Sequence, residues 1–253
     1  MTRERIVVGN WKMYKSIAET IDFVKTLAPL VVGSQAAVFL AVPFTAIRAA
    51  ADAAEDSRIV IGAQNMNDAR EGAFTGEIAA SMLVEAGARF VLIGHSERRT
   101  LFHESDEEIN RKLLAALHST LRPILCIGES LEEREGGRTG ECLRAQLDLA
   151  LKGIEAEPFR RVIIAYEPCW AIGTGKTATP EIAEQAHLLC RGHIASLYGD
   201  EIAGSTPLLY GGSVRPDSTP PLMQEADIDG LLVGGSSLDP YVFSKIVNYQ
   251  PVR

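Results

Sequence analysis

Short continuous runs of apolar residues alternate along this chain with longer stretches in which apolar residues recur at helical spacing. Apolar runs without polar alternation predict strands buried on both faces, as in a parallel sheet covered by helices. Eight such runs occur: Ile6–Val8, Ala37–Val42, Ile59–Ala63, Phe90–Ile93, Ile124–Ile127, Val162–Ala165, Leu208–Tyr210 and Leu231–Val233.

The stretches between these runs predict helices. Ser16 followed three residues later by Glu19 predicts a capping box at the start of the first helix. The residues expected on the buried face of this helix are Ile17, Ile21, Val24 and Leu27. Further helices are predicted after Pro43 and over Glu107–Leu117, Leu143–Leu151 and Glu181–Leu197.

Eight strand–helix units in 253 residues fit a closed α/β barrel, and an open doubly wound sheet is the competing architecture. No linker or low-complexity segment divides the chain. Glycines and polar residues cluster just after the strands. In both architectures that is the end of the sheet where ligands bind.

Composition and charge exclude several classes of function. The net charge of −8 provides no basic surface for nucleic acid, so an anionic small molecule would have to be attracted by local groups. No apolar run approaches the roughly 20 residues that span a bilayer, and the amino-terminal stretch does not resemble a signal peptide. The widely spaced cysteines predict neither a disulfide framework nor a zinc cluster, but reduced thiols in a cytosol: Cys126, Cys142, Cys169 and Cys190.

The stretch from Ile163 to Thr179 carries the strongest local signal of function. A buried strand delivers one carboxylate, Glu167, at its end, and Pro168 fixes the turn that follows. The apolar segment Trp170–Ile172 precedes Gly173, in what must be a loop. This order suggests a base beneath a lid, whereas the simpler interpretation is a surface turn with local packing of the tryptophan.

Three familiar motifs are matched only in part. Residues 173–178 fit the glycine pattern of a dinucleotide site, but they begin seven residues beyond the strand, and no acidic residue ends the next strand. The same segment lacks the earlier glycine of a phosphate-binding P-loop. His95 with Glu97 imitates half of a zinc deaminase signature, but its second cysteine is missing. We treat all three matches as coincidences.

Lys12, His95 and Glu167 follow the first, fourth and sixth predicted strands. Each has a simple structural explanation: a solvated lysine, a satisfied histidine, or a carboxylate that caps its own loop. Barrel closure would nevertheless bring all three to one mouth. Glycine turns after the seventh and eighth strands, 211–213 and 234–236, would present backbone N–H groups suited to phosphate.

Several stretches together, in order along nearly the whole chain, resemble the triosephosphate isomerase family: Gly9–Met13, Gly72–Glu77, Gly94–Arg99, Ala165–Gly175, Tyr210–Ser213, Asp227–Gly230 and Leu232–Gly235. The resemblance implies an α/β fold with a single (β/α)8 TIM barrel over residues 1–253. It implies interconversion of dihydroxyacetone phosphate and glyceraldehyde 3-phosphate, with no cofactor and no metal. It also implies a cytoplasmic homodimer.

The resemblance assigns roles to residues present here. Glu167 would be the base and His95 the electrophile, while Lys12 would supply positive charge and Asn10 a hydrogen bond. The histidine is expected to be neutral, with its pKa lowered by a helix N-terminus; this arrangement is a known example from the family. The residues expected to support these groups are Glu97, Ser96 and Cys126. Besides Asn10 and Lys12, those expected to bind substrate or phosphate are Gly173, Ser213, Gly234 and Gly235.

Two loops complete the expected site. Residues 168–176 would form a closing lid, and the long loop 65–76 would carry Phe74 and Thr75 into a second subunit. A flexible surface loop is the alternative for the second of these. Three positions depart from the commonest family pattern, with Cys169, Ser218 and Ser236 in place of valine, asparagine and alanine.

Two other classes of function are alternatives to this isomerase. A nicotinamide-dependent oxidoreductase would rest on the partial glycine motif. A barrel that binds ligands without catalysis is disfavoured because Asn10, Lys12, His95 and Glu167 are all present.

Overall fold

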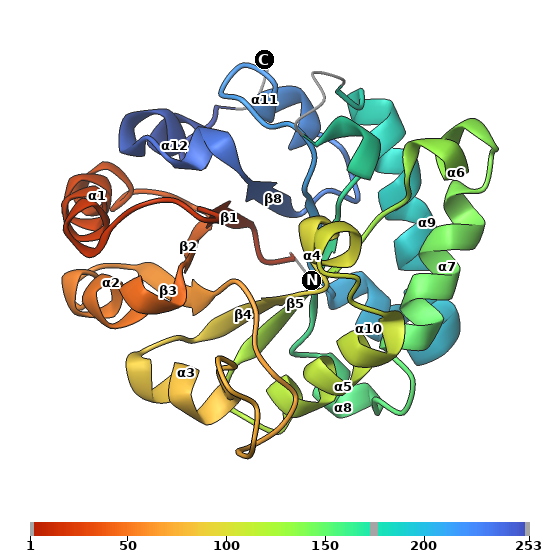
Figure 1. The fold of residues 1–253 in the computed structure, drawn as a ribbon. Coiled ribbons are helices and arrows are strands. Elements are labelled where there is room, and N and C mark those ends of the chain that lie inside the picture. Colours follow the sequence, from red (N-terminus) through yellow and green to blue (C-terminus); the bar gives the residue numbers. More distant parts are fainter. Residues whose placement is uncertain (1–2, 173–176, 251–253) are drawn as a thin grey trace.

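The computed structural model describes residues 3–172 and 177–250. Within these residues eight parallel strands pair in sequence order, and the last pairs with the first to close a barrel. The strands form the centre of the view in Figure 1. They are β1 Ile6–Asn10, β2 Ala37–Val42, β3 Ile59–Ala63, β4 Phe90–Ile93, β5 Arg122–Ile127, β6 Ile163–Tyr166, β7 Leu208–Tyr210 and β8 Gly230–Val233.

Helices form a ring outside the strands (Figure 1). The longer ones are α1 Ile17–Leu30, α2 Ile47–Ala53, α3 Ala80–Ala86, α5 Asp106–Leu117, α7 Thr139–Ala150, α9 Pro180–Tyr198 and α12 Pro240–Val247. Shorter helices that the sequence pattern did not indicate are α6 Leu131–Glu135, α8 Ala156–Phe159, α10 Asp200–Ser205 and α11 Thr219–Leu222. The short helix α4 Ser96–Leu101 provides the helix start that was expected beside His95. Single 3-10 turns occur at Phe44–Ala46, Cys169–Ala171 and Gly235–Ser237.

The continuous apolar runs arise because each strand is covered on both faces. In β1, Ile6 and Val8 join a cluster made only of strand residues, which fills the barrel interior. Val7 lies between them in the chain and joins the larger cluster shared with the helices. Alternate side chains of a strand point to opposite faces, so one short run supplies both layers.

A close contact inside the barrel explains a glycine within β3. The rings of Phe39 and Phe90 meet there with centroids 4.8 Å apart. A Cβ atom at Gly62 would lie 2.3 Å from the Phe90 ring, so no larger residue fits beside this pair. The Phe90 ring therefore fits because the neighbouring residue on β3, Gly62, has no side chain.

The first helix begins as predicted, but its buried face differs. The Ser16 side chain and the Glu19 side chain form the capping box. The buried residues are Thr20, Phe23, Val24 and Leu27. Ile17 is 51% exposed and Ile21 is only partly buried, so the prediction was wrong for Ile17 and held only in part for Ile21. The reason is that Phe23 packs edge-on against Trp11, with ring centroids 4.7 Å apart. This contact directs the helix face that carries Phe23 toward the barrel.

The predicted (β/α)8 TIM barrel is confirmed, and the doubly wound sheet was the wrong alternative. Strand boundaries moved by no more than two residues, as at β5, which begins at Arg122 rather than Ile124. Among the described residues, no helix is long and apolar enough to cross a bilayer.

Candidate active site

Four polar residues lie at the barrel mouth where the strands end. Asn10 is the last residue of β1, and Lys12 follows it closely. His95 and Glu167 lie just beyond β4 and β6. The parallel strands bring all four to one rim, where they line a cavity of about 250 Å³.

Glu167 lines this cavity, and its side chain is 2% exposed. Its own N–H donates to the carbonyl of Ile127 on β5 at 2.7 Å, which continues the sheet to this residue. One carboxylate oxygen accepts the Ser96 N–H at 3.0 Å, and the other lies 2.9 Å from Nε2 of His95. Burial disfavours the charged carboxylate, but His95 and the Ser96 N–H together outweigh it, so the pKa of Glu167 lies below its ordinary value.

His95 precedes α4 and its ring bonds the start of that helix. Nδ1 accepts the Glu97 N–H at 3.2 Å, so a neutral ring carries its proton on Nε2, facing Glu167. Burial opposes the charged ring, but attraction by Glu167, helped by Glu97, is stronger and raises the pKa of His95. The prediction of a lowered pKa was therefore wrong for this arrangement, in which the carboxylate lies against the ring.

Lys12 adopts a backbone conformation that is uncommon for a residue other than glycine, with φ of 52°. Its N–H donates to Oδ1 of Asn10 at 3.0 Å, and its carbonyl accepts from Nε2 of Gln64 at 2.8 Å. The ammonium group forms an ion pair with Glu97. These contacts fix the direction of the Lys12 side chain, and Gln64 is a supporting residue that sequence reasoning did not single out.

The glycine turns after β7 and β8 lie in the same cavity. Ser213, Gly234 and Gly235 line it, as predicted, whereas Gly173 lies outside the described residues. Gly211 is sterically required, because a Cβ atom there would approach the Glu167 side chain to 2.8 Å. Glu167 and the turn after β7 are therefore packed against each other.

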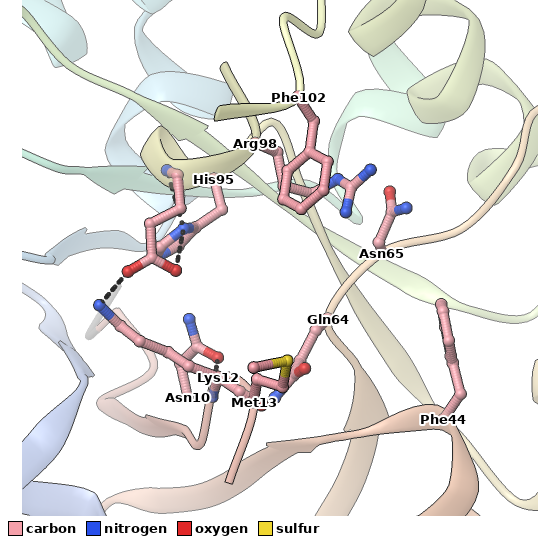
Figure 2. A pocket seen from close by; sticks show the side chains of 10 residues that line it. Asn10, Lys12, Met13, Phe44, Gln64, Asn65, His95, Arg98 and Phe102 are labelled. Atoms are coloured by element: carbon pink, nitrogen blue, oxygen red, sulfur yellow. Dashed lines mark hydrogen bonds and ion pairs between the residues drawn. The ribbon is translucent and has the colours of Figure 1, made fainter. Parts of the chain in front are cut away.

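A second hollow of about 200 Å³ adjoins the first and shares Asn10, Lys12 and His95 with it. Figure 2 shows His95 and Lys12 at the left of this hollow and Phe44 at the right. Met13 on its rim is 94% exposed. Asn10, Lys12 and His95 thus lie between the first cavity and a hollow whose lining includes the apolar side chains of Met13, Phe44 and Phe102.

Glu129 is a buried carboxylate that the sequence analysis did not assign. It lies just beyond β5 and accepts hydrogen bonds from the Tyr166 hydroxyl at 3.1 Å and Trp170 Nε1 at 2.9 Å. The Arg134 guanidinium lies over the Trp170 ring. These contacts bury the tryptophan, which was expected at an apolar loop crest, and anchor the segment after Glu167. An acidic residue just after a strand was the signal that could have identified Glu129.

The remaining predicted residues divide into two groups. Cys126 is fully buried in the barrel interior and interacts with the Glu167 carboxylate, while Ser96 bonds the same group. Phe74 and Thr75 line neither hollow and are exposed on their loop. No cluster of three or more histidine, cysteine or acidic residues suited to a metal ion occurs within residues 3–172 and 177–250.

Comparison with known proteins agrees with this arrangement. The chain matches the family described as Triosephosphate isomerase over residues 5–250. It is 51% identical to the triosephosphate isomerase of Protochlamydia amoebophila, over 97% of this chain and 93% of that protein. It is 49% identical to that of Solibacter usitatus and 48% identical to that of Caldanaerobacter subterraneus, each over 98% of this chain and the whole of the relative. This chain belongs to the triosephosphate isomerase family.

Proposed function

We propose that this protein is an aldose–ketose isomerase of glycolysis that interconverts dihydroxyacetone phosphate and D-glyceraldehyde 3-phosphate through an enediolate. The observation that carries the proposal is the contact between Glu167 and Nε2 of His95, 2.9 Å apart, in a cavity lined by glycine turns. It places a buried base beside a hydrogen-bond donor and next to a site for an anion. The family and its named relatives support isomerisation and give no support to a nicotinamide-dependent oxidoreductase.

Glu167 would remove the proton from one carbon and return it to the neighbouring carbon. Its carboxylate contacts the Ser96 N–H and His95, so it has to leave both to reach a substrate carbon. Leaving these donors removes the interactions that lower its pKa, and burial alone then favours the protonated form. The same movement therefore makes the carboxylate a stronger base.

His95 and Lys12 would stabilise the charge that develops on the substrate oxygens. The neutral ring offers Nε2–H, because Nδ1 is occupied by the Glu97 N–H. Once Glu167 turns away, the main influence that raises the pKa of His95 is lost, and burial then favours the neutral ring. Donors held in place before the reaction stabilise an oxyanion without reorganisation at the moment of reaction.

The phosphate group would bind the backbone N–H groups of Ser213, Gly234 and Gly235. A Cβ atom at Gly234 would lie 3.4 Å from Cε of Lys12, so the lysine side chain passes beside this turn. A cation and a set of N–H groups at one end of the cavity attract a dianion despite the net charge of −8. Binding energy from this remote group can then favour the geometry needed for proton transfer.

The direct test supplies glyceraldehyde 3-phosphate to the pure protein in deuterated water and follows dihydroxyacetone phosphate by NMR. Proton transfer through an enediolate predicts product that carries deuterium at the carbon receiving the proton. No product, or product formed only when a nicotinamide cofactor is added, would refute the proposal.

A homodimer would complete this site. Exposed apolar side chains on or near the second hollow include Met13, Phe44 and Phe102, at 94%, 39% and 64% exposure. Phe74, at the tip of the loop 65–76, is 52% exposed. An apolar loop tip and a hollow lined in part by exposed apolar side chains are complementary features that a two-fold dimer can pair reciprocally. The loop of each subunit would then lie beside Lys12 of the other.

We place this activity in the cytoplasm. All four cysteines are free thiols, and Cys126 lies inside the barrel against the catalytic base. A reducing compartment keeps such thiols intact.

A further inference from the structure

Two serine side chains hold the same peptide group in the turn that follows β7. Oγ of Ser236 donates to the carbonyl of Val214 at 2.7 Å. Oγ of Ser218 accepts the N–H of Arg215 at 2.9 Å. The Val214 carbonyl and the Arg215 N–H belong to one planar peptide unit, so hydrogen bonds fix it at both ends.

The two serines belong to different parts of the barrel mouth. Ser236 lies in the 3-10 turn after β8, whereas Ser218 immediately precedes α11. Ser218 also donates to the carbonyl of Arg215 at 3.1 Å, which closes its own turn. The peptide group is thus connected to the neighbouring strand–helix unit on one side and to its own helix on the other.

This peptide group lies next to the turn proposed to bind phosphate. Ser213, Val214, Arg215 and Ser236 all line the cavity of about 250 Å³ that contains Glu167. The Ser213 N–H belongs to the preceding part of the same turn. Rotation of the clamped peptide would change ψ of Val214 and φ of Arg215, and the adjoining backbone that carries the Ser213 N–H would have to adjust. The clamp opposes that rotation and preorganises the donors.

The two contacts differ in what they require of the side chain. Asparagine at position 218 could still accept an N–H through its amide oxygen. Alanine at position 236 could not donate to Val214, so the connection between the two turns depends on the Ser236 hydroxyl.

We propose that Ser236 and Ser218 are positioning residues that clamp the Val214–Arg215 peptide and thereby increase the affinity of the barrel mouth for a phosphate group. The inference rests on the proposed function, since it assigns the anion to the substrate site. The two residues act through the turn and do not carry out the chemical step. Their effect therefore falls on binding of the phosphate end of the substrate.

The test measures the affinity for inorganic phosphate by ³¹P NMR, together with KM and kcat, for Ser236→Ala, Ser218→Ala and the double variant. One hydrogen bond of ordinary net strength corresponds to a weakening of about 2- to 10-fold. We expect that loss in Ser236→Ala for both phosphate affinity and KM, with kcat nearly unchanged. Ser236→Thr and Ser218→Asn, which retain the donor and the acceptor, should bind phosphate nearly as well as the wild type.

The matched control is Ser205→Ala, which removes a comparable bond from a serine hydroxyl to the Ile202 carbonyl, of 3.0 Å, at the end of α10. Unchanged phosphate affinity in Ser236→Ala would overturn the inference, as would an equal loss in the Ser205 control. A fall in kcat and in the midpoint of thermal unfolding without a change in phosphate affinity would also overturn it. Failure of the wild type to isomerise would contradict the proposed function, and the phosphate affinities would still decide whether the clamp acts.

Discussion

Replacing Glu167 by glutamine removes the proposed base while preserving side-chain shape. Among the described residues that line the cavity of about 250 Å³, Glu167 is the sole carboxylate. Glu97 lines the second hollow and is paired with Lys12, so it cannot substitute. General base catalysis contributes about 10²–10⁴-fold, or roughly 3–5 kcal/mol of activation free energy. Without a substitute carboxylate, we expect a loss of kcat near the upper end of that range.

The fold and the binding of phosphate should survive this change. The amide oxygen can still accept the Ser96 N–H, and the buried negative charge disappears. The assay follows kcat, the KM for glyceraldehyde 3-phosphate and the affinity for inorganic phosphate. Glu135→Gln, the same change on an exposed carboxylate of α6, is the control. A Glu167→Gln enzyme that keeps near wild-type turnover would show that another group removes the proton.

Three further predictions concern stability and assembly. Burial lowers the pKa of His187 to about 4. As the pH falls below 6.5, this histidine is therefore protonated in the unfolded chain before it is protonated in the folded one. The free energy of unfolding should decrease by about 3 kcal/mol towards pH 4. His187→Asn should flatten this slope in urea titrations, and an unchanged slope would exclude the histidine as its cause. Gly62→Ala, which places a methyl group against Phe90, should destabilise the protein by about 1–3 kcal/mol. The control Gly33→Ala, which has no atom within 4 Å of the added methyl group, should be nearly neutral. Equal denaturation midpoints for the two variants would refute the packing argument. Shortening the loop at residues 71–76 should give a monomer of low activity in sedimentation and turnover assays, and a fully active monomer would rule out dependence on a partner.

Much of the architecture followed from local pattern. The eight apolar runs predicted the strands because residues buried on both faces leave no polar alternation. Ser16 with Glu19 predicted the start of α1 because a capping box depends only on neighbours in the chain. The buried face of that helix was less predictable, since the contact of Phe23 with Trp11 decides it.

The site was predictable in its members but less so in its interactions. The positions of Asn10, Lys12, His95 and Glu167 after strands indicated one mouth, and the cavity contains all four. The raised pKa of His95 was not predictable, because it depends on a carboxylate that is distant in sequence and 2.9 Å away in space. For the same reason, the hydrogen bond from Gln64 to the carbonyl of Lys12 could not be predicted from the sequence.

The sequence by itself determined the strand–helix order, the candidate catalytic residues and the turns rich in glycine, because each depends on short-range spacing. Tertiary structure alone decided which groups touch. It set the contact of Glu129 with Trp170 and the clamp of Ser236 on Val214, two bonds across 41 and 22 residues of chain. Barrel closure creates such contacts by bringing the ends of different strands together. Their effects on charge and orientation act over a few ångströms of space, whatever the separation along the chain.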